Sequence, residues 1–298
     1  MTDRQKGLLA ALGFAVTLGF SFLFMKIALR YATPIDLLAH RFTAAMLAGL
    51  VFVIVGKRWD IFTKNHFRAL FPVSLIYPTL FFFFQALGLD RVTSSEAGII
   101  NASMPIFTLV LASFILGETS SRRQKGFILL SAFGIGFIFA MQLDDSLSPS
   151  LVGSLFMVLS IVSNALYKVL ARRLTKRYDL LTLTFITTLY TFIYFNGIAA
   201  VSHIRSNDWS GYVEPLTSPA FLGSIAFLGM LASFGAGFLS NYALSKIKAA
   251  TMSVFSNVST LLTITLGITL LGETLAWYHV VGGMFVVCGV IGTTLSKH

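Results

Sequence analysis

The chain has 298 residues, of which 56% are hydrophobic and only 11% are charged, and its mean hydropathy is +0.81. A soluble globule of this length needs more polar surface, so the composition excludes one and predicts an all-α integral membrane protein. The net charge of +10 does not indicate a nucleic-acid partner, because the basic residues lie in short stretches between apolar runs. A single cysteine, Cys288, excludes a disulfide framework.

Ten apolar segments reach the length that a helix needs to cross a bilayer. They lie at about 7–28, 35–55, 69–89, 97–116, 126–142, 151–171, 180–202, 220–243, 249–271 and 277–295. The first segment is too long for the hydrophobic region of a signal peptide, so we expect it to remain in the protein. The pattern therefore predicts ten transmembrane helices.

The basic residues predict the orientation, because short loops rich in Lys and Arg stay on the cytoplasmic side of the membrane. With the N-terminus inside, sixteen of the 22 basic residues lie on the cytoplasmic side. Only Arg30, Arg91 and Arg205 lie outside. Both termini are therefore expected to be cytoplasmic. Lys26 and Lys168 lie late in the first and sixth segments, where we expect their ammonium groups to reach the membrane surface.

Short matches relate the two halves of the chain. The matching stretches are Leu116-Gly117-Glu118-Thr119 with Leu271-Gly272-Glu273-Thr274, Asp36-Leu37-Leu38 with Asp179-Leu180-Leu181, and Ala86-Leu87 with Ala243-Leu244. They occur in the same order and at corresponding places, which predicts two five-helix repeats, residues 1–145 and 148–298. Because five is odd, the second repeat crosses the membrane in the opposite sense. Inverted repeats of this kind are typical of secondary transporters.

The fourth segment combines polar groups with a proline near the middle of an apolar run. Glu96 stands at its start, Asn101 follows, and Pro105 comes four residues after Asn101. A proline cannot donate to the carbonyl four residues back, so Pro105 leaves the Asn101 carbonyl without its helical partner. Such groups are costly in lipid and must face protein or a water-filled cavity. We predict that this segment lines a path and that Pro105 is a conformational hinge.

Other spans carry neutral polar and aromatic side chains. Together with Glu96 and Asn101, the predicted substrate-binding set contains Tyr77, Asn164, Tyr167, Tyr190, Tyr194, Asn241 and Asn257. Pro78, which frees the Ser74 carbonyl, is predicted as a second hinge. Aromatic walls and amide donors would suit a zwitterionic or aromatic small molecule. Hydrogen bonding between helices is the alternative explanation for the polar residues.

Glu96 has two interpretations. A carboxylate within a membrane span is a functional candidate, and here it could bind a substrate ammonium or a proton that acts as the coupling ion. Alternatively, Glu96 is a structural residue at the outer start of its helix, paired with Arg41 or Arg91. Glycines in the fifth and tenth segments, among them Gly134 and Gly282, predict that these two helices pack closely as a scaffold.

No sequence motif points to an enzyme. The chain contains no phosphate-binding loop, no His-Glu-x-x-His and no Gly-x-Ser-x-Gly. The five histidines are scattered, without the spacing of zinc ligands. We therefore expect no catalytic residues, metal or cofactor, and transport driven by the substrate gradient, the membrane potential or protons.

Several of these features are together similar to the EamA branch of the drug/metabolite transporter superfamily. They are the two halves with their Leu-Gly-Glu-Thr ends, Lys26, the Arg41-Phe42 pair and the Pro105 helix. The run from Glu96 to Asn101 also resembles the fourth helix of bacterial aromatic amino-acid exporters. The resemblance implies alternating access at a midplane cavity, export of amino acids or related compounds, and a bacterial cytoplasmic (inner) membrane. An importer of a cationic or nucleoside-like metabolite is the alternative, and a membrane protein that transports nothing is the third, less favoured one.

Overall fold

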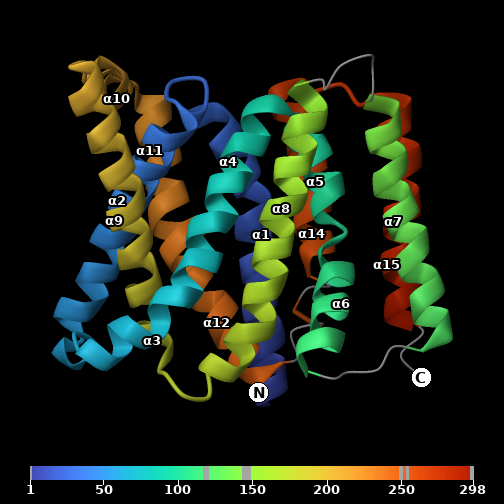
Figure 1. Cartoon of the computed structure of the whole chain (residues 1–298), viewed down its shortest axis with the longest axis horizontal. Coiled ribbons are helices and arrows are strands. Elements are labelled where there is room, and N and C mark those ends of the chain that lie inside the picture. The colour runs from blue at the N-terminus through green and yellow to red at the C-terminus, as the bar shows by residue number, and fades with distance from the viewer. Residues whose placement is uncertain (1, 117–120, 143–148, 248–250, 253–254, 296–298) are drawn as a thin grey trace.

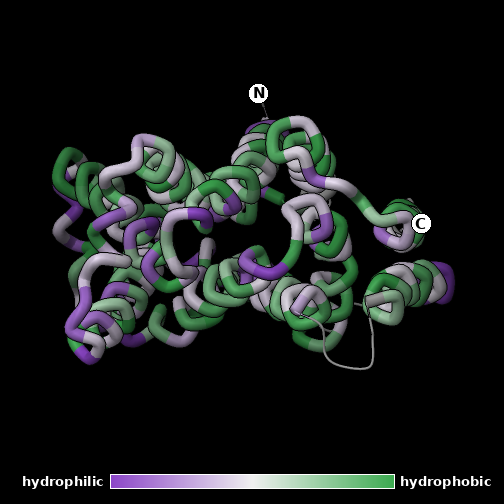
Figure 2. The backbone as a smooth tube through the Cα atoms, turned by 90° about the horizontal axis from the view of Figure 1, so that it is seen from above, coloured by the Kyte–Doolittle hydropathy of each residue, from purple (hydrophilic) through white to green (hydrophobic). Residues whose placement is uncertain are grey.

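A computed structural model shows an elongated bundle of helices (Figure 1). It describes residues 2–116, 121–142, 149–247, 251–252 and 255–295. Within those ranges all regular structure is helical, as the composition predicts. Figure 2, viewed from above, shows most helices end-on and hydrophobic residues along much of their length.

The longer helices follow one another as antiparallel crossings of the bundle (Figure 1). The elements are α1 (Asp3–Ala28), α2 (Pro34–Val55), η1 (Trp59–Ile61), α3 (Lys64–Ser74), η2 (Leu75–Leu80), α4 (Phe81–Arg91), α5 (Ser94–Asn101), α6 (Met104–Leu116), α7 (Arg122–Gln142), α8 (Pro149–Leu174), α9 (Leu180–Ser206), α10 (Ser210–Val213), η3 (Glu214–Thr217), α11 (Pro219–Ala226), η4 (Phe227–Gly235), α12 (Ala236–Lys246), α14 (Ser256–Leu271) and α15 (Trp277–Leu295).

Eight helical stretches are long and apolar enough to cross a membrane, and two shorter apolar helices, Val258–Leu271 and Trp277–Gly292, follow them. Many large apolar side chains on these helices point outward, among them Val51, Phe52, Phe114, Leu129 and Met284. So much exposed apolar area is unfavourable on a surface in contact with water, but it is favourable on a surface in contact with lipid. The fold is that of a multi-pass membrane protein.

Capping residues determine where several helices begin. Thr33 accepts a hydrogen bond from the Asp36 amide, and Pro34 fills the first position of α2, where its missing N–H is not needed. Thr93 and Asp179 cap α5 and α9 in the same way. These caps place the following polar residues within the first turn of each helix.

Three interruptions of the crossings lie within the residues that the structure describes. η2 is a π-helix in which Tyr77 has an extended backbone (φ −147°, ψ 130°), directly before Pro78. As the position of Pro105 predicts, α5 ends at Asn101 and α6 begins at Met104. The third interruption, η4, is also a π-helix, and it joins α11 to α12. π-Helical segments occur frequently at functional sites.

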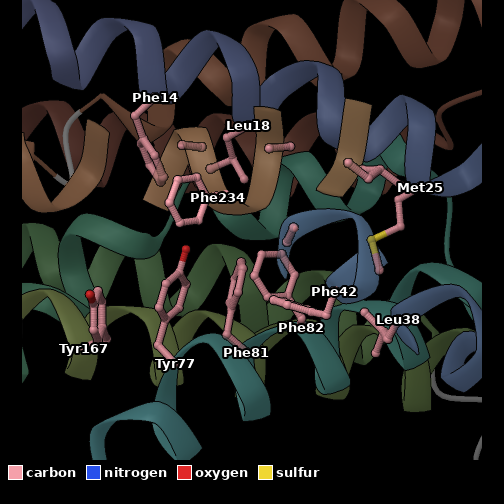
Figure 3. Close-up of a cluster of buried hydrophobic side chains, with 14 of the residues drawn as sticks. Phe14, Leu18, Met25, Leu38, Phe42, Tyr77, Phe81, Phe82, Tyr167 and Phe234 are labelled. Atoms are coloured by element: carbon pink, nitrogen blue, oxygen red, sulfur yellow. The ribbon is translucent and has the colours of Figure 1, made fainter. Parts of the chain in front are cut away.

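The largest group of buried side chains lies between α1 and the helices that face it (Figure 3). Phe14, Leu18 and Met25 of α1 lie on one side of this cluster. Tyr77, Phe81, Phe82 and Phe42 form a row on the other side, and Phe234 lies between them. The cluster therefore joins helices from both predicted halves of the chain.

α7 and α15 lie side by side at one end of the bundle (Figure 1). A Cβ atom on Gly134 would stand 2.6 Å from the carbonyl oxygen of Gly282, and one on Gly289 would stand 2.6 Å from the carbonyl oxygen of Phe127. No side chain fits at these positions, because the two backbones are in contact there. The close packing that the glycines predict is present.

Gly134→Ala is expected to lower the stability of the protein by about 1 to 3 kcal/mol, because the added methyl group meets the α15 backbone. Gly136→Ala is the matched control on the same helix, since nothing lies within 4 Å of its added Cβ. It should be neutral or stabilising, because alanine favours a helix more than glycine does. Apparent unfolding temperatures of the two variants in detergent provide the measurement. Equal midpoints would show that the close packing contributes nothing.

Candidate functional site

A small cavity lies within the buried cluster, between the helices of the two predicted halves. Its lining residues are Phe42, Tyr77, Pro78, Phe82, Tyr167, Thr184, Thr187, Thr188, Ser233, Gly237 and Asn241. They come from α2, η2 and α4 of the first half and from α8, α9, η4 and α12 of the second. The cavity volume is about 10 Å³, which is close to the minimum for one water molecule. In this conformation the site is occluded.

A chain of hydrogen bonds crosses the wall of this cavity. The Tyr167 hydroxyl donates to Asn241 Oδ1 at 2.6 Å, and Asn241 Nδ2 donates to Thr184 Oγ1 at 2.9 Å. The ring of Tyr77 stacks on that of Tyr167, with 4.4 Å between centroids. The structure thus brings together Tyr77, Tyr167 and Asn241 of the predicted set, from three segments distant in the sequence.

The break in η2 explains how Tyr77 reaches the cavity. Its extended backbone interrupts the helix one residue before Pro78, which also lines the cavity. On the next residue, the Thr79 hydroxyl shares a hydrogen bond of 2.8 Å with that of Thr191, which fixes η2 against α9. The predicted hinge at Pro78 therefore adjoins the binding wall directly.

Arg41 lies at the edge of the cavity and is fully buried. Its Nε donates to the Ser233 hydroxyl at 2.7 Å, and its Cζ stands 4.0 Å from the centre of the Phe82 ring. Both partners line the cavity. The predicted site set omitted Arg41, although a charge inside an apolar span is a signal of function. From the sequence, Arg41 is predicted only as a possible partner of Glu96.

Glu96 is buried elsewhere, between α5, α8 and α15. The Ser154 hydroxyl donates to its Oε1, and His279 Nε2 lies 3.4 Å from its Oε2. The alternative pairing with Arg41 or Arg91 is wrong, because Arg41 borders the cavity and Arg91 lies 3.6 Å from Asp90. Ser154 and His279 were not predicted, since neither residue stands out in its own segment.

Four of the other predicted site residues, Asn101, Asn164, Tyr190 and Tyr194, do not line the cavity. Asn101 is buried and donates to the Ser259 hydroxyl at 3.3 Å, while the Tyr190 hydroxyl donates to the Phe67 carbonyl at 3.2 Å. Asn164 is buried, and its Nδ2 has no hydrogen-bond partner. Tyr194 is 41% exposed on the outside of α9. The Asn257 side chain lies outside the described part of the structure.

Lys168 corrects an expectation. It is fully buried, with Nζ 3.1 Å from Met104 Sδ and 5.7 Å from the centre of the Phe14 ring, so it does not reach the membrane surface. α8 packs against α4, α5 and α6, which leaves its long side chain no path to water. Lys26 instead donates to the Leu89 and Val92 carbonyls and so caps the end of α4.

A carboxylate joins α5 to the loop between α14 and α15. Glu273 accepts hydrogen bonds from the amides of Ser94 (2.8 Å) and Ser95 (2.9 Å) and from both serine hydroxyls. The start of a helix favours a negative charge, because its first amides are unpaired. Glu118, the corresponding residue of the first repeat, lies outside the described residues. We call this contact the Glu273 clamp.

The described residues contain no group of three or more His, Cys, Asp or Glu that could hold a metal ion. What the cavity offers is aromatic surface, hydroxyl and amide groups, and one cation at its edge. Such a site can bind and orient a small organic molecule.

Comparisons with known proteins point in one direction. The sequence pattern of the EamA-like transporter family matches residues 5–140 and again residues 151–295. The chain is 45% identical over 289 residues to the Bacillus subtilis protein named "Uncharacterized transporter YcxC", covering 97% of this chain and 92% of that one. It is 26% identical to an "Uncharacterized transporter" of Archaeoglobus fulgidus, covering 99% of both chains. A crystal structure with 17% sequence identity has the same fold, with a TM-score of 0.62 over 98% of this chain and 96% of that one.

Proposed function

Because the chain belongs to the EamA-like transporter family, we propose that it is a secondary transporter with its substrate site at the cavity around Tyr77, Tyr167 and Asn241. The observation that carries the proposal is the position of this cavity, between helices of the two halves and next to two helix breaks. A site that opens alternately to the two sides of a membrane needs such a place, where the two halves can move against each other.

We further propose ten transmembrane helices arranged as two inverted repeats, residues 1–145 and 148–298. Two observations support this arrangement. The family pattern matches the chain twice, and the π-helices η2 and η4 interrupt the third and the eighth predicted segments, which correspond to each other in the two halves. The two shorter helices, Val258–Leu271 and Trp277–Gly292, would be the ninth and tenth crossings.

The proposed substrate is a small organic metabolite, an amino acid or a related compound, exported across a bacterial inner membrane. The stacked rings of Tyr77 and Tyr167 would hold an apolar or aromatic part, and Asn241 would offer hydrogen bonds. The competing hypothesis is import of a cationic or nucleoside-like metabolite.

Transport by purified protein in liposomes tests the proposal. Liposomes that contain the protein and are loaded with an unlabelled amino acid should take up the labelled form by exchange faster than protein-free liposomes. Asn241→Ala should lower this rate, whereas Tyr194→Phe, a change on the exposed side of α9, should leave it unchanged. Exchange no faster than in protein-free liposomes, across amino acids, amines and nucleosides, would contradict a transport function.

The predicted orientation has its own test. A cytoplasmic reporter fused after the last residue, or at Lys64, should be active, and a reporter that works only outside should be silent. The reason is the sixteen-to-three distribution of basic residues between the two sides. External activity at either position would contradict the ten-helix topology.

Pro105→Ala is expected to lower the maximal transport rate several-fold with little change in the substrate concentration at half-maximal rate. Pro105 lies just after the break between α5 and α6 and away from the cavity, so the change should affect the movement of the helix more than binding. Pro72→Ala, at an exposed position of α3, is the control. Initial rates over a range of substrate concentrations separate the two effects. A change in half-saturation alone would contradict a hinge.

A further inference from the structure

Arg41 is a buried cation without an acidic partner. Its side chain is 0% exposed, and no carboxylate among the described residues lies within ion-pair distance of it. Its polar neighbours are the Ser233 hydroxyl and Met25 Sδ, which is 3.5 Å from Nη1. Nη2 has no hydrogen-bond partner at all. The guanidinium therefore has both an uncompensated charge and an unused donor.

Such an arrangement is costly. A buried charge whose partner is missing destabilises a protein, and a buried donor without an acceptor adds a further penalty. Within a membrane span, cations that are not at the helix ends mark substrate or ion pathways. Arg41 lies in α2 between Leu38 and Phe42, which are both fully buried in the apolar cluster (Figure 3), so packing alone would favour an apolar side chain here.

Two contacts hold the guanidinium against the cavity. The bond from Nε to Ser233 fixes one edge, and the Phe82 ring lies under Cζ at 4.0 Å. Because Ser233 and Phe82 both line the cavity, the group is held beside the space that a substrate would occupy. A planar guanidinium with free donors matches a planar oxyanion, which it can bind through two parallel hydrogen bonds.

We propose that Arg41 binds a carboxylate group of the transported molecule. This inference rests on the proposed transport function and specifies its substrate class. The apolar part of the molecule would lie on the rings of Tyr77 and Tyr167. Since no acidic residue in the described part of the chain lines the cavity to receive an ammonium group, the site favours an organic anion over a zwitterion, and both over a cation.

Lys168 provides an internal comparison. It is equally buried and also lies outside ion-pair distance of every described carboxylate. Its contacts, however, are Met104 and Phe14, and neither belongs to the cavity lining. Replacing Lys168 with an uncharged residue therefore removes a buried cation but leaves the proposed site around Arg41 unchanged.

Three ligands that differ only around the carboxylate test the proposal with the wild-type protein. They are L-phenyllactate, L-phenylalanine and L-phenylalanine amide, which at about pH 6 are an anion, a zwitterion and a cation and which share the benzyl group. Two quantities are measured for each ligand. The first is its exchange rate in liposomes, after subtraction of the rate in protein-free liposomes, and the second is the rise that it causes in the apparent unfolding temperature in detergent. Phenyllactate should be bound and exchanged best, phenylalanine less well, and the amide not measurably.

Variants then assign the preference to Arg41. Arg41→Gln should raise the half-saturating concentration of phenyllactate by about 10- to 100-fold, the effect expected for losing a hydrogen-bonded charged partner. Arg41→Lys should retain part of the affinity, because it keeps the charge but not the planar pair of donors. Ser233→Ala, which keeps the charge and removes only its support, should give a smaller loss of several-fold. Lys168→Met should leave the order of the three ligands unchanged.

Unfolding temperatures without ligand show whether each variant is folded. If Arg41→Gln does not fold, the loss of phenyllactate affinity in Ser233→Ala still tests the role of Arg41. Equal transport of the amide and the carboxylates, or an unchanged preference in folded Arg41→Gln, would overturn the role of Arg41 and leave the transport function standing. Failure of the wild-type protein to bind or exchange any of the three would count against the carboxylate site and the proposed function together.

Discussion

Replacing Glu96 with glutamine is expected to abolish the pH dependence of transport while folded protein still reaches the membrane. The carboxylate is buried, accepts a hydrogen bond from Ser154 and lies 3.4 Å from His279 Nε2. Glutamine keeps the shape but cannot take up or release a proton. If one proton moves with each cycle, a potential of ~100 mV contributes ~2.3 kcal/mol, equivalent to an about 50-fold concentration ratio. The variant should lose this accumulation but retain exchange.

Accumulation and exchange of labelled substrate in liposomes, with and without an imposed membrane potential and pH gradient, measure the two properties separately. Glu214→Gln is the matched control, since Glu214 is an exposed carboxylate in η3. If Glu96→Gln lowers the unfolding temperature and leaves both flux per folded molecule and its pH profile intact, Glu96 is a structural residue.

Asn241→Leu should cause the second large effect, a loss of about 2 to 4 kcal/mol of stability together with loss of transport. Leucine has nearly the same size but cannot accept from Tyr167 or donate to Thr184. Both buried groups would then be without the partner that Asn241 supplies, and an apolar side chain would replace an amide in the cavity wall. Unfolding temperature in detergent and exchange in liposomes measure the two losses.

Asn164→Leu is the control for this prediction. Asn164 is as deeply buried as Asn241, but its Nδ2 has no hydrogen-bond partner, so its removal should cost little stability. Tyr167→Phe should lose an amount of stability between those of the two asparagine variants, because it deletes only the hydroxyl that donates to Asn241. Equal losses of stability for the two asparagine variants would mean that the hydrogen-bond chain does not stabilise the site.

Much of the fold could be predicted because its signals are local. Apolar length indicates the crossings, and Pro78 and Pro105 indicate two of the three helix breaks. The third break, η4, contains no proline, so nothing in its sequence predicted a π-helix. It packs against α2, where a Cβ on Gly229 would meet the backbone at Arg41 and Ala45. This break is tied to contacts between distant segments, which a local pattern does not contain.

The site was only partly predictable for a related reason. In a membrane the outward and inward faces of a helix are both apolar, so helical spacing does not show which face meets a cavity. Residue type alone selected Tyr77, Tyr167 and Asn241, which the structure brings to one cavity, but it also selected Tyr194, which is exposed on the outside of α9. Ser233 lies 192 residues from its partner Arg41, and His279 lies 183 residues from Glu96, so only the fold could reveal these two pairs.

The Glu273 clamp implies an all-or-none movement at this end of the bundle. Its carboxylate is held at once by two amides and two hydroxyls of adjacent residues, Ser94 and Ser95. Separating α5 from the loop that carries Glu273 exposes all these donors to water, because the four groups belong to two adjacent residues at the start of α5. Partly opened forms are therefore disfavoured, and this end of the transporter should behave as a latch with two positions. Substitutions of Glu273 should change the lifetime of the closed form more than the distance by which α5 and the Glu273 loop separate.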